Sequence, residues 1–238
     1  MGTLLLSVDG VNKRFGGLKA VSDMSFDVQV GEVVGLMGPN GAGKTTLLNV
    51  LAGAYRPDSG TVMFKGRDIV GLPPHKICRS GIARTYQIPQ PFTHLSVQDN
   101  ILVAALYGRG IKKDDAASEV NRLFDFVGLS EKKDMLSKDL KTISLKKLEL
   151  ARALASDPEL ILLDEVGAGS TEAEIPQILN TIKKLREMGK TVIMVEHIMK
   201  VMIEAVDRLV VMDKGSKIAE GPPDEVMNDQ KVIDAYLG

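Results

Sequence analysis

Hydrophobic and polar residues follow two strand-like patterns along this chain, and together they predict an α/β protein. In Val21–Val30 apolar residues alternate with polar ones, as in a half-buried antiparallel strand, and Leu4–Val11 is predicted to be a second strand. Val33–Met37 and Leu160–Leu163 are instead apolar runs, and Thr191–Val195 is predicted to be another buried strand. Such runs are typical of central strands in a parallel sheet, which are buried on both faces. Shorter strands are predicted at residues 61–65, 82–86, 208–212 and 217–220.

Helical patterns fill the middle of the chain. Ser96–Asp99 resembles a capping box, and it predicts a helix that runs through Leu106 and ends at Gly108. An amphipathic helix closed by Gly128 follows, and a third helix is predicted over Lys141–Ser156. No obvious strand interrupts these helices.

The helical stretch divides the strands of the chain into two groups. We therefore expect residues 88–156 to form a helical subdomain, and residues 1–87 and 157–238 to form the core. A second capping box at Thr171–Glu174 begins another helix in the core, and two short helices are predicted after Pro223.

Composition limits the class of protein. The 238 residues suffice for one sizeable core, and the formal net charge of −1 gives no general attraction to nucleic acid. Cys78 is the one cysteine, so an internal disulfide is excluded. Apolar runs stay shorter than the roughly 18 residues that a membrane span requires, and we expect a soluble protein that is not secreted.

The strongest chemical signal is the sequence Gly38-Pro39-Asn40-Gly41-Ala42-Gly43-Lys44-Thr45-Thr46, which lies between a predicted buried strand and a predicted helix. Glycines in this context let the backbone turn its N–H groups toward a phosphate, and the helix N-terminus adds partial positive charge. Lys44 can reach the β- and γ-phosphates, and the Thr45 hydroxyl can ligate Mg²⁺. The alternative, a glycine-rich turn without a ligand, is less consistent with the flanking strand and helix.

Polar residues follow the ends of three predicted strands, where ligands bind in open α/β sheets. Asp164 can hold the Mg²⁺ shell through water, and Glu165 can act as a general base on a water that attacks the γ-phosphate. His197 can donate a hydrogen bond to that phosphate, and Gln87 can contact Mg²⁺ or the attacking water. Phe15 can stack on a purine. Taken singly, each of these would be an ordinary strand-end, loop or core residue.

In this order the motifs resemble those of the ATP-binding subunit of an ABC transporter, over nearly the whole chain. The resemblance identifies Phe15 with the A-loop, residues 38–46 with Walker A, Gln87 with the Q-loop, residues 160–165 with Walker B and its catalytic glutamate, and His197 with the switch histidine. It implies a P-loop NTPase core, a mostly parallel sheet with an N-terminal antiparallel β subdomain and an inserted α-helical subdomain, with ATP and Mg²⁺ as ligands.

Several stretches are similar to the importer branch for branched-chain amino acids, the Liv type. They are residues 14–18, 81–87, 148–154, 195–200 and 235–238. Related subunits move amides or urea, and a lipopolysaccharide-export ATPase is similar in length and C-terminus. A regulatory nucleotide-binding module with little turnover is a further alternative, against which Glu165 and His197 argue.

The resemblance also implies partners. They are a second ATPase subunit in a homo- or heterodimer, transmembrane permease subunits and, indirectly, a solute-binding protein, with no nucleic acid. The chain would then lie in the cytoplasm, on the inner face of the membrane. A permease helix would dock near residues 88–95, where Pro89, Pro91 and Phe92 give an exposed, partly apolar segment; a simple linker is the alternative.

The family's signature segment, which faces the partner's ATP, is altered here. Without gaps it falls on Leu140, Lys141, Thr142, Ile143 and Ser144, so that lysine replaces its serine and isoleucine its second glycine. A three-residue deletion would instead place Ser144 in the signature role. Val166 stands where the family usually has proline, and Ser170-Thr171 replace the usual D-loop pair.

Overall fold

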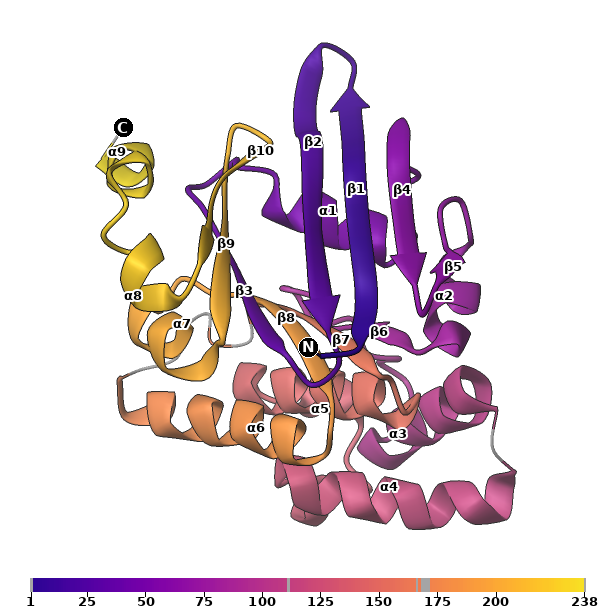
Figure 1. The fold of residues 1–238 in the computed structure, drawn as a ribbon. Coiled ribbons are helices and arrows are strands. Elements are labelled where there is room, and N and C mark those ends of the chain that lie inside the picture. The colour runs from indigo at the N-terminus through magenta and orange to yellow at the C-terminus, as the bar shows by residue number, and fades with distance from the viewer. Residues whose placement is uncertain (1, 111, 166, 168–171, 238) are drawn as a thin grey trace. The chain divides into compact units, whose positions relative to one another are not determined.

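The computed structural model describes residues 2–110, 112–165, 167 and 172–237, and Figure 1 shows their strands and helices. The chain divides into two compact units, one of residues 1–74 and 162–238 and the other of residues 75–161. Among the described residues, no helix combines the length and apolarity that crossing a bilayer requires.

The first unit contains a four-stranded antiparallel sheet in the order β2-β1-β4-β5. Its strands are β1 (Leu4–Phe15), β2 (Leu18–Gln29), β4 (Ser59–Phe64) and β5 (Arg67–Asp68). The alternation predicted for β2 is confirmed, since Met24, Phe26 and Val28 are buried. Both long strands extend further than the sequence pattern predicted, because Arg14 pairs with Lys19 and the turn is confined to Gly16 and Gly17.

The second sheet of this unit is mostly parallel and contains the three predicted buried strands. Its order is β10-β9-β3-β8-β7, from β10 (Ser216–Gly221), β9 (Arg208–Asp213), β3 (Val33–Met37) and β8 (Thr191–Val195) to β7 (Leu160–Asp164). Strand β3 pairs in parallel with both β8 and β9, and β10 is antiparallel. Every residue of β3, β7 and β8 is buried, as predicted for central strands.

The described part of the first unit also contains helices. They are α1 (Lys44–Leu51), α6 (Ile175–Glu187), α7 (Met199–Ala205), α8 (Pro223–Val226) and α9 (Gln230–Leu237). Helix α6 follows the short 3-10 turn η4 (Glu172–Glu174), and Pro176 lies in its first turn, where proline costs least. The capping box predicted at Thr171 lies outside the described residues.

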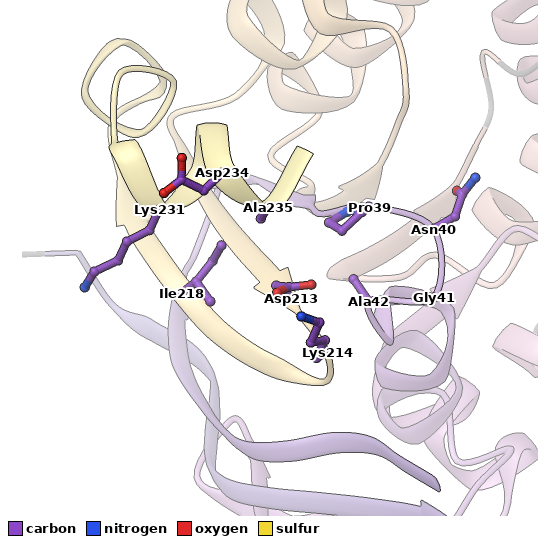
Figure 2. A pocket seen from close by; sticks show the side chains of 10 residues that line it. All are labelled: Pro39, Asn40, Gly41, Ala42, Asp213, Lys214, Ile218, Lys231, Asp234 and Ala235. Atoms are coloured by element: carbon purple, nitrogen blue, oxygen red, sulfur yellow. The ribbon is translucent and has the colours of Figure 1, made fainter. Parts of the chain in front are cut away.

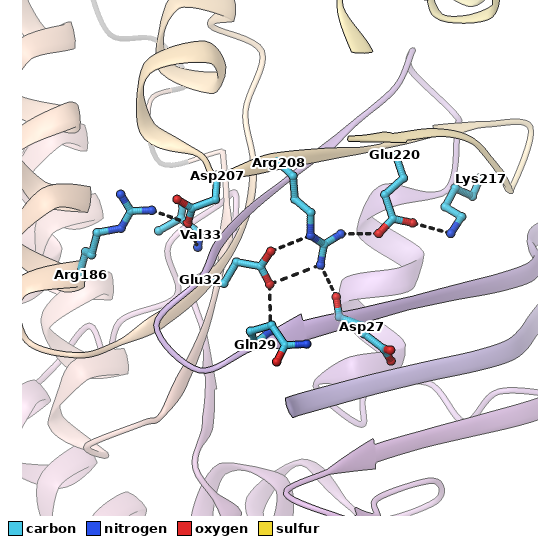
Figure 3. Close-up of polar contacts among 9 residues, drawn as sticks. All are labelled: Asp27, Gln29, Glu32, Val33, Arg186, Asp207, Arg208, Lys217 and Glu220. Atoms are coloured by element: carbon cyan, nitrogen blue, oxygen red, sulfur yellow. Dashed lines mark hydrogen bonds and ion pairs between the residues drawn. The ribbon is translucent and has the colours of Figure 1, made fainter. Parts of the chain in front are cut away.

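A network of charged side chains joins the two sheets of the first unit (Figure 3). The Arg208 guanidinium, at the start of β9, pairs with Glu32 at 2.6 Å and Glu220 at 2.5 Å, and it donates to the backbone carbonyl of Asp27 in β2. The neighbouring Asp207 accepts a hydrogen bond from the Val33 N–H at 2.8 Å. These contacts fix the beginning of β3, the strand that leads into the glycine-rich loop.

The second unit is mainly helical. It contains α2 (Pro74–Ser80), β6 (Ile82–Arg84), α3 (Val97–Ala104), η1 (Ala105–Arg109), α4 (Lys113–Val127), η2 (Ser130–Lys132), η3 (Ser137–Asp139) and α5 (Thr142–Ala155). The Ser96 hydroxyl accepts a hydrogen bond from the Asp99 N–H, which confirms the predicted cap of α3. Gly128 ends α4 in a left-handed conformation, also as predicted.

The predicted end of the first helix at Gly108 is wrong. Helix α3 passes into a π-helical turn, and the left-handed residue that ends it is Gly110. Glycine is needed at position 108 for another reason: a Cβ there would lie 2.9 Å from the Cβ of Ser156. Close packing therefore explains this glycine better than a helix stop.

Candidate nucleotide site

The phosphate loop, residues 38–46, begins where β3 ends and leads into α1. Gly38, Gly41 and Gly43 have φ angles of 144°, 81° and 102°, a region that favours glycine. A Cβ at Gly38 would lie 2.1 Å from the Met212 carbonyl oxygen, and a Cβ at Gly43 would lie 2.1 Å from that of Ala20. The glycines are thus required by the path of the backbone.

Lys44 is buried at the start of α1 and is held inside the loop. Its ammonium donates to the carbonyl oxygens of Gly38 at 2.6 Å and Pro39 at 3.0 Å. Burial lowers the pKa of Lys44, and the negative charges of Glu165 and Asp164 oppose that shift. The carboxylates of Glu165 and Asp164 are therefore near enough to the ammonium to favour its charged form.

Glu165 and His197 meet at the carboxyl ends of β7 and β8. Oε1 of Glu165 lies 2.8 Å from Nε2 of His197, and the Glu165 N–H donates to the carbonyl of Val195 at 2.9 Å. Glu165 has a φ of 51°, an uncommon conformation for a residue with a side chain. Asp164, one residue earlier, is buried. The predicted grouping of a carboxylate and a histidine at neighbouring strand ends is present.

Phe15 lies at the end of β1 and is 44% exposed, so it is not a core residue. Its ring packs edge-on against Tyr55, with centroids 5.1 Å apart and planes at 74°. The Lys13 ammonium lies 5.4 Å from the centre of the Phe15 ring. An exposed ring that a neighbour holds in place can stack on a flat ligand such as a purine.

Sequence reasoning missed the role of Glu196. This buried carboxylate accepts a hydrogen bond from the Gly167 N–H, two residues beyond Glu165. A Cβ at Gly167 would lie 3.1 Å from both carboxylate oxygens of Glu196. The sequence feature that could have pointed to Glu196 is a charged residue directly between a buried strand and a histidine. The altered D-loop positions Val166, Ser170 and Thr171 lie outside the described residues.

In the second unit, Gln87 follows β6 and is exposed. The strand ends at Arg84, earlier than predicted, so Gln87 stands in an irregular segment rather than directly at a strand end. Arg152 of α5 organises that segment. Its guanidinium donates to the Gln90 carbonyl at 2.7 Å, pairs with Glu149 at 3.1 Å and lies 5.0 Å from the Phe92 ring centre.

The altered signature residues lie at the beginning of α5. Lys141 is its N-cap, in an extended conformation, and Thr142 is its first residue. Ile143 is exposed, whereas Ser144 is buried and its hydroxyl accepts a hydrogen bond from Lys132 at 2.7 Å. Ser144 is thus engaged within its own unit, and the placing of Lys141 in the signature position stays a prediction.

The donor set fits a nucleoside triphosphate with Mg²⁺. The glycine cradle and the helix N-terminus suit an anion, and an added Cβ at Gly41 would face open space among the described residues. Mg²⁺ at such sites takes one or two protein oxygens together with phosphate and water oxygens. The exposed Thr45 hydroxyl and the Asp164 carboxylate are oxygens of this kind.

A glycine-rich loop between a buried parallel strand and a helix, with carboxylates at the end of another strand, defines a P-loop nucleotide-binding protein. A family model described as ABC transporter matches residues 21–168, and one described as Branched-chain amino acid ATP-binding cassette transporter matches residues 216–238. The chain therefore belongs to the ABC transporter ATP-binding family. It is an ATPase, and its hydrolysis is coupled to transport.

Similar proteins match along their full length. The chain is 36% identical to the high-affinity branched-chain amino acid transport ATP-binding protein LivG of Salmonella typhimurium, covering 100% of this chain and 99% of that protein. It is also 36% identical to BraF of Pseudomonas aeruginosa, with the same coverage and the same description. A crystal structure of a nucleotide-free ATP-binding cassette from an ABC transporter is 31% identical, with a TM-score of 0.88, covering 99% of this chain and 100% of that one.

Proposed function

We propose that this chain powers an importer of branched-chain amino acids or related amides. The observation that carries the proposal is the contact between Glu165 and His197 in the same electrostatic environment as Lys44 of the phosphate loop. The descriptions of the LivG and BraF proteins, together with the family model that matches residues 216–238, support the choice of solute.

In this proposal the phosphate loop binds ATP. The backbone N–H groups of residues 38–46 and the Lys44 ammonium hold the phosphates, and the exposed ring of Phe15 stacks on the adenine. Thr45, Asp164 and Gln87 are the residues that would hold Mg²⁺. When bound, Mg²⁺ would neutralise charge that develops on the phosphate oxygens.

Glu165 is the proposed general base. Its carboxylate accepts a proton from a water whose oxygen forms a bond to the γ-phosphorus, while the bond from that phosphorus to the β–γ bridging oxygen breaks and ADP leaves. Nε2 of His197 lies 2.8 Å from the Glu165 carboxylate and orients it, and when ATP binds the same N–H can donate to the γ-phosphate instead. A general base of this kind contributes about 10²–10⁴ in rate.

The proposed partners follow from the family. Two ATPase subunits close around ATP, and the helical part, residues 88–156, transmits the closure to permease subunits that hold the chain at the inner face of the membrane. The exposed side chains of Ile88 and Phe92 suit the docking of a permease helix. A solute-binding protein acts through the permease.

We further propose that the dimer is asymmetric. Lys141 and the exposed Ile143 occupy signature positions where the family has serine and glycine, so this chain offers a weakened signature to its partner. A cation about 4 Å from phosphate charge gains up to ~4 kcal/mol at an effective dielectric of 20, so Lys141 compensates in part. If the partner is a different subunit with an intact signature, the site built on this chain's Lys44 and Glu165 hydrolyses ATP faster than the opposite site.

The test is ATP turnover and solute uptake by the assembled transporter in liposomes. Glu165→Gln should lower both by about 10²–10⁴ while ATP still binds. Glu131→Gln is the matched control, because Glu131 is an exposed glutamate in η2, and it should leave both unchanged. Near-normal turnover with Glu165→Gln would show that the competent site is not on this chain. If Glu165→Gln loses ATPase but the transporter proves to take up a solute other than a branched-chain amino acid or an amide, only the choice of solute is overturned.

A further inference from the structure

The C-terminal helix α9 reaches the first residue of the phosphate loop. The Gly38 N–H donates a hydrogen bond to the hydroxyl oxygen of Tyr236 at 2.9 Å, across 198 positions of the sequence. We propose that Tyr236 is a positioning residue for the phosphate loop, and that α9 thereby forms part of the nucleotide site. This inference rests on the proposed binding of phosphates by residues 38–46.

Gly38 is the residue through which the tyrosine acts on Lys44. Its N–H donates to Tyr236, while its carbonyl oxygen accepts from the Lys44 ammonium at 2.6 Å. Gly38 also lies so close to β9 that a Cβ would overlap the Met212 carbonyl. A displacement of Gly38 therefore moves the carbonyl that holds the lysine expected to reach the phosphates.

The helix that carries Tyr236 is anchored, and the Tyr236 side chain itself is 47% exposed. Val232, one helical turn before Tyr236, is 2% exposed and anchors α9. The backbone N–H groups of Val232 and Ile233 donate to the Asp229 carbonyl, which fixes the start of the helix. Burial raises the pKa of Tyr236, so its hydroxyl stays protonated near neutral pH and its oxygen accepts the Gly38 N–H as a neutral group.

A pocket of about 490 Å³ is lined by residues of the loop and by residues of α9, and Figure 2 shows their side chains. Its lining comprises Pro39, Asn40, Gly41, Ala42, Asp213, Lys214, Ile218, Lys231, Asp234 and Ala235. Residues 39–42 and α9 therefore face the same open space. The hydrogen bond at Gly38 links the helix to the loop directly.

The size of the effect follows from the kind of bond. A neutral hydrogen bond contributes about 0.5–1.5 kcal/mol net, which corresponds to a roughly 2- to 12-fold change in an equilibrium constant. Without the bond, the loop is in its binding conformation less of the time. The apparent affinity for ATP then falls by the same roughly 2- to 12-fold factor.

The experiment uses the purified full chain and a fluorescent ATP analogue. Tyr236→Phe keeps the ring and removes the hydroxyl, and it should weaken binding by about 2- to 12-fold and speed hydrogen exchange at the Gly38 amide. The matched control is Tyr107→Phe, whose side chain is 69% exposed and should leave both quantities unchanged. The thermal midpoint of each variant, measured in parallel, separates loop positioning from a general loss of stability.

Three outcomes overturn the proposal: Tyr236→Phe binds as the wild type does, Tyr107→Phe weakens binding equally, or affinity falls only in step with the thermal midpoint while Gly38 exchange is unchanged. Lys44→Ala distinguishes failure of this inference from failure of the proposed site. If Lys44→Ala abolishes binding and Tyr236→Phe has no effect, the phosphate loop stands and the role of α9 falls. If Lys44→Ala also binds normally, the phosphate loop itself is wrongly assigned.

Discussion

Replacing Arg208 tests whether the charge network at the beginning of β3 and β9 stabilises the first unit. The Arg208 side chain is 18% exposed and its partner Glu32 is 15% exposed, so both charges are largely removed from water. Three acceptors surround the guanidinium: the carboxylates of Glu32 and Glu220 and the carbonyl of Asp27 (Figure 3). Arg208→Met keeps an apolar stem of similar reach and leaves the acceptors without the guanidinium.

The expected loss lies between two limits. Exposed ion pairs contribute about 0–1 kcal/mol, whereas removing one partner of a fully buried pair costs about 3–5 kcal/mol. With roughly a sixth of each side chain still exposed, we expect Arg208→Met to lower the free energy of unfolding by about 2–3 kcal/mol. For a chain of this size the thermal midpoint should fall by roughly 4–12 °C.

Urea unfolding of the purified chain measures the loss, and Arg122→Met is the matched control. Arg122 pairs with Glu119 on the surface of α4 and is 48% exposed, so its replacement should cost less than about 0.5 kcal/mol. A double-mutant cycle with Glu32→Gln should give a coupling energy of about 1 kcal/mol or more. Equal losses for the two arginine variants, or a coupling energy near zero, would refute the reasoning.

Two further predictions concern the phosphate loop and the second unit. Gly43→Ala should abolish ATP binding, because its Cβ would meet the Ala20 carbonyl. Gly41→Ala should bind ATP more weakly than wild type but still measurably, since its Cβ would face open space. Titration with a fluorescent ATP analogue compares the two variants, and equal affinities would contradict the prediction. Burial raises the pKa of Glu149 above 4.5, so its folded form holds the proton more tightly than the unfolded form does. The stability that Glu149 contributes is greatest below pH 4.5 and is lost as pH rises through the raised pKa. Glu149→Gln should remove this pH dependence of the free energy of unfolding, measured by urea unfolding from pH 4 to 7. An unchanged pH dependence would show that Glu149 is not its source.

The sequence predicted best those elements whose cause is local. The bounds of β3 and β8 match the buried strands predicted from the sequence, because a strand buried on both faces is mostly apolar along its length. The helix that begins at Lys44 was predicted from the glycines before it. Glu165 and His197 could be placed together, because carboxyl ends of neighbouring strands meet at one edge of a sheet.

Contacts between distant residues could not be predicted in this way. The link from Gly38 to Tyr236 spans 198 positions, and the hydrogen bond from Val33 to Asp207 spans 174. Each member has an ordinary local pattern, and only the folded chain brings the pair together. Gly108 was interpreted as a helix stop because a glycine required by packing looks the same in sequence as one required by a turn.

Two of the contacts between distant residues fix the backbone beside a residue that carries the proposed chemistry. Tyr236 holds Gly38 beside Lys44, and Glu196 holds Gly167 two residues from Glu165. Glu165 itself has a positive φ, which costs of order 1–3 kcal/mol for a residue with a side chain and persists only where its surroundings enforce it. Its N–H bond to Val195 and its contact with His197 supply that enforcement. This strained conformation places the Glu165 carboxylate where two strand ends converge. The position of the carboxylate in the proposed site therefore explains the conformation, whereas chain packing alone does not.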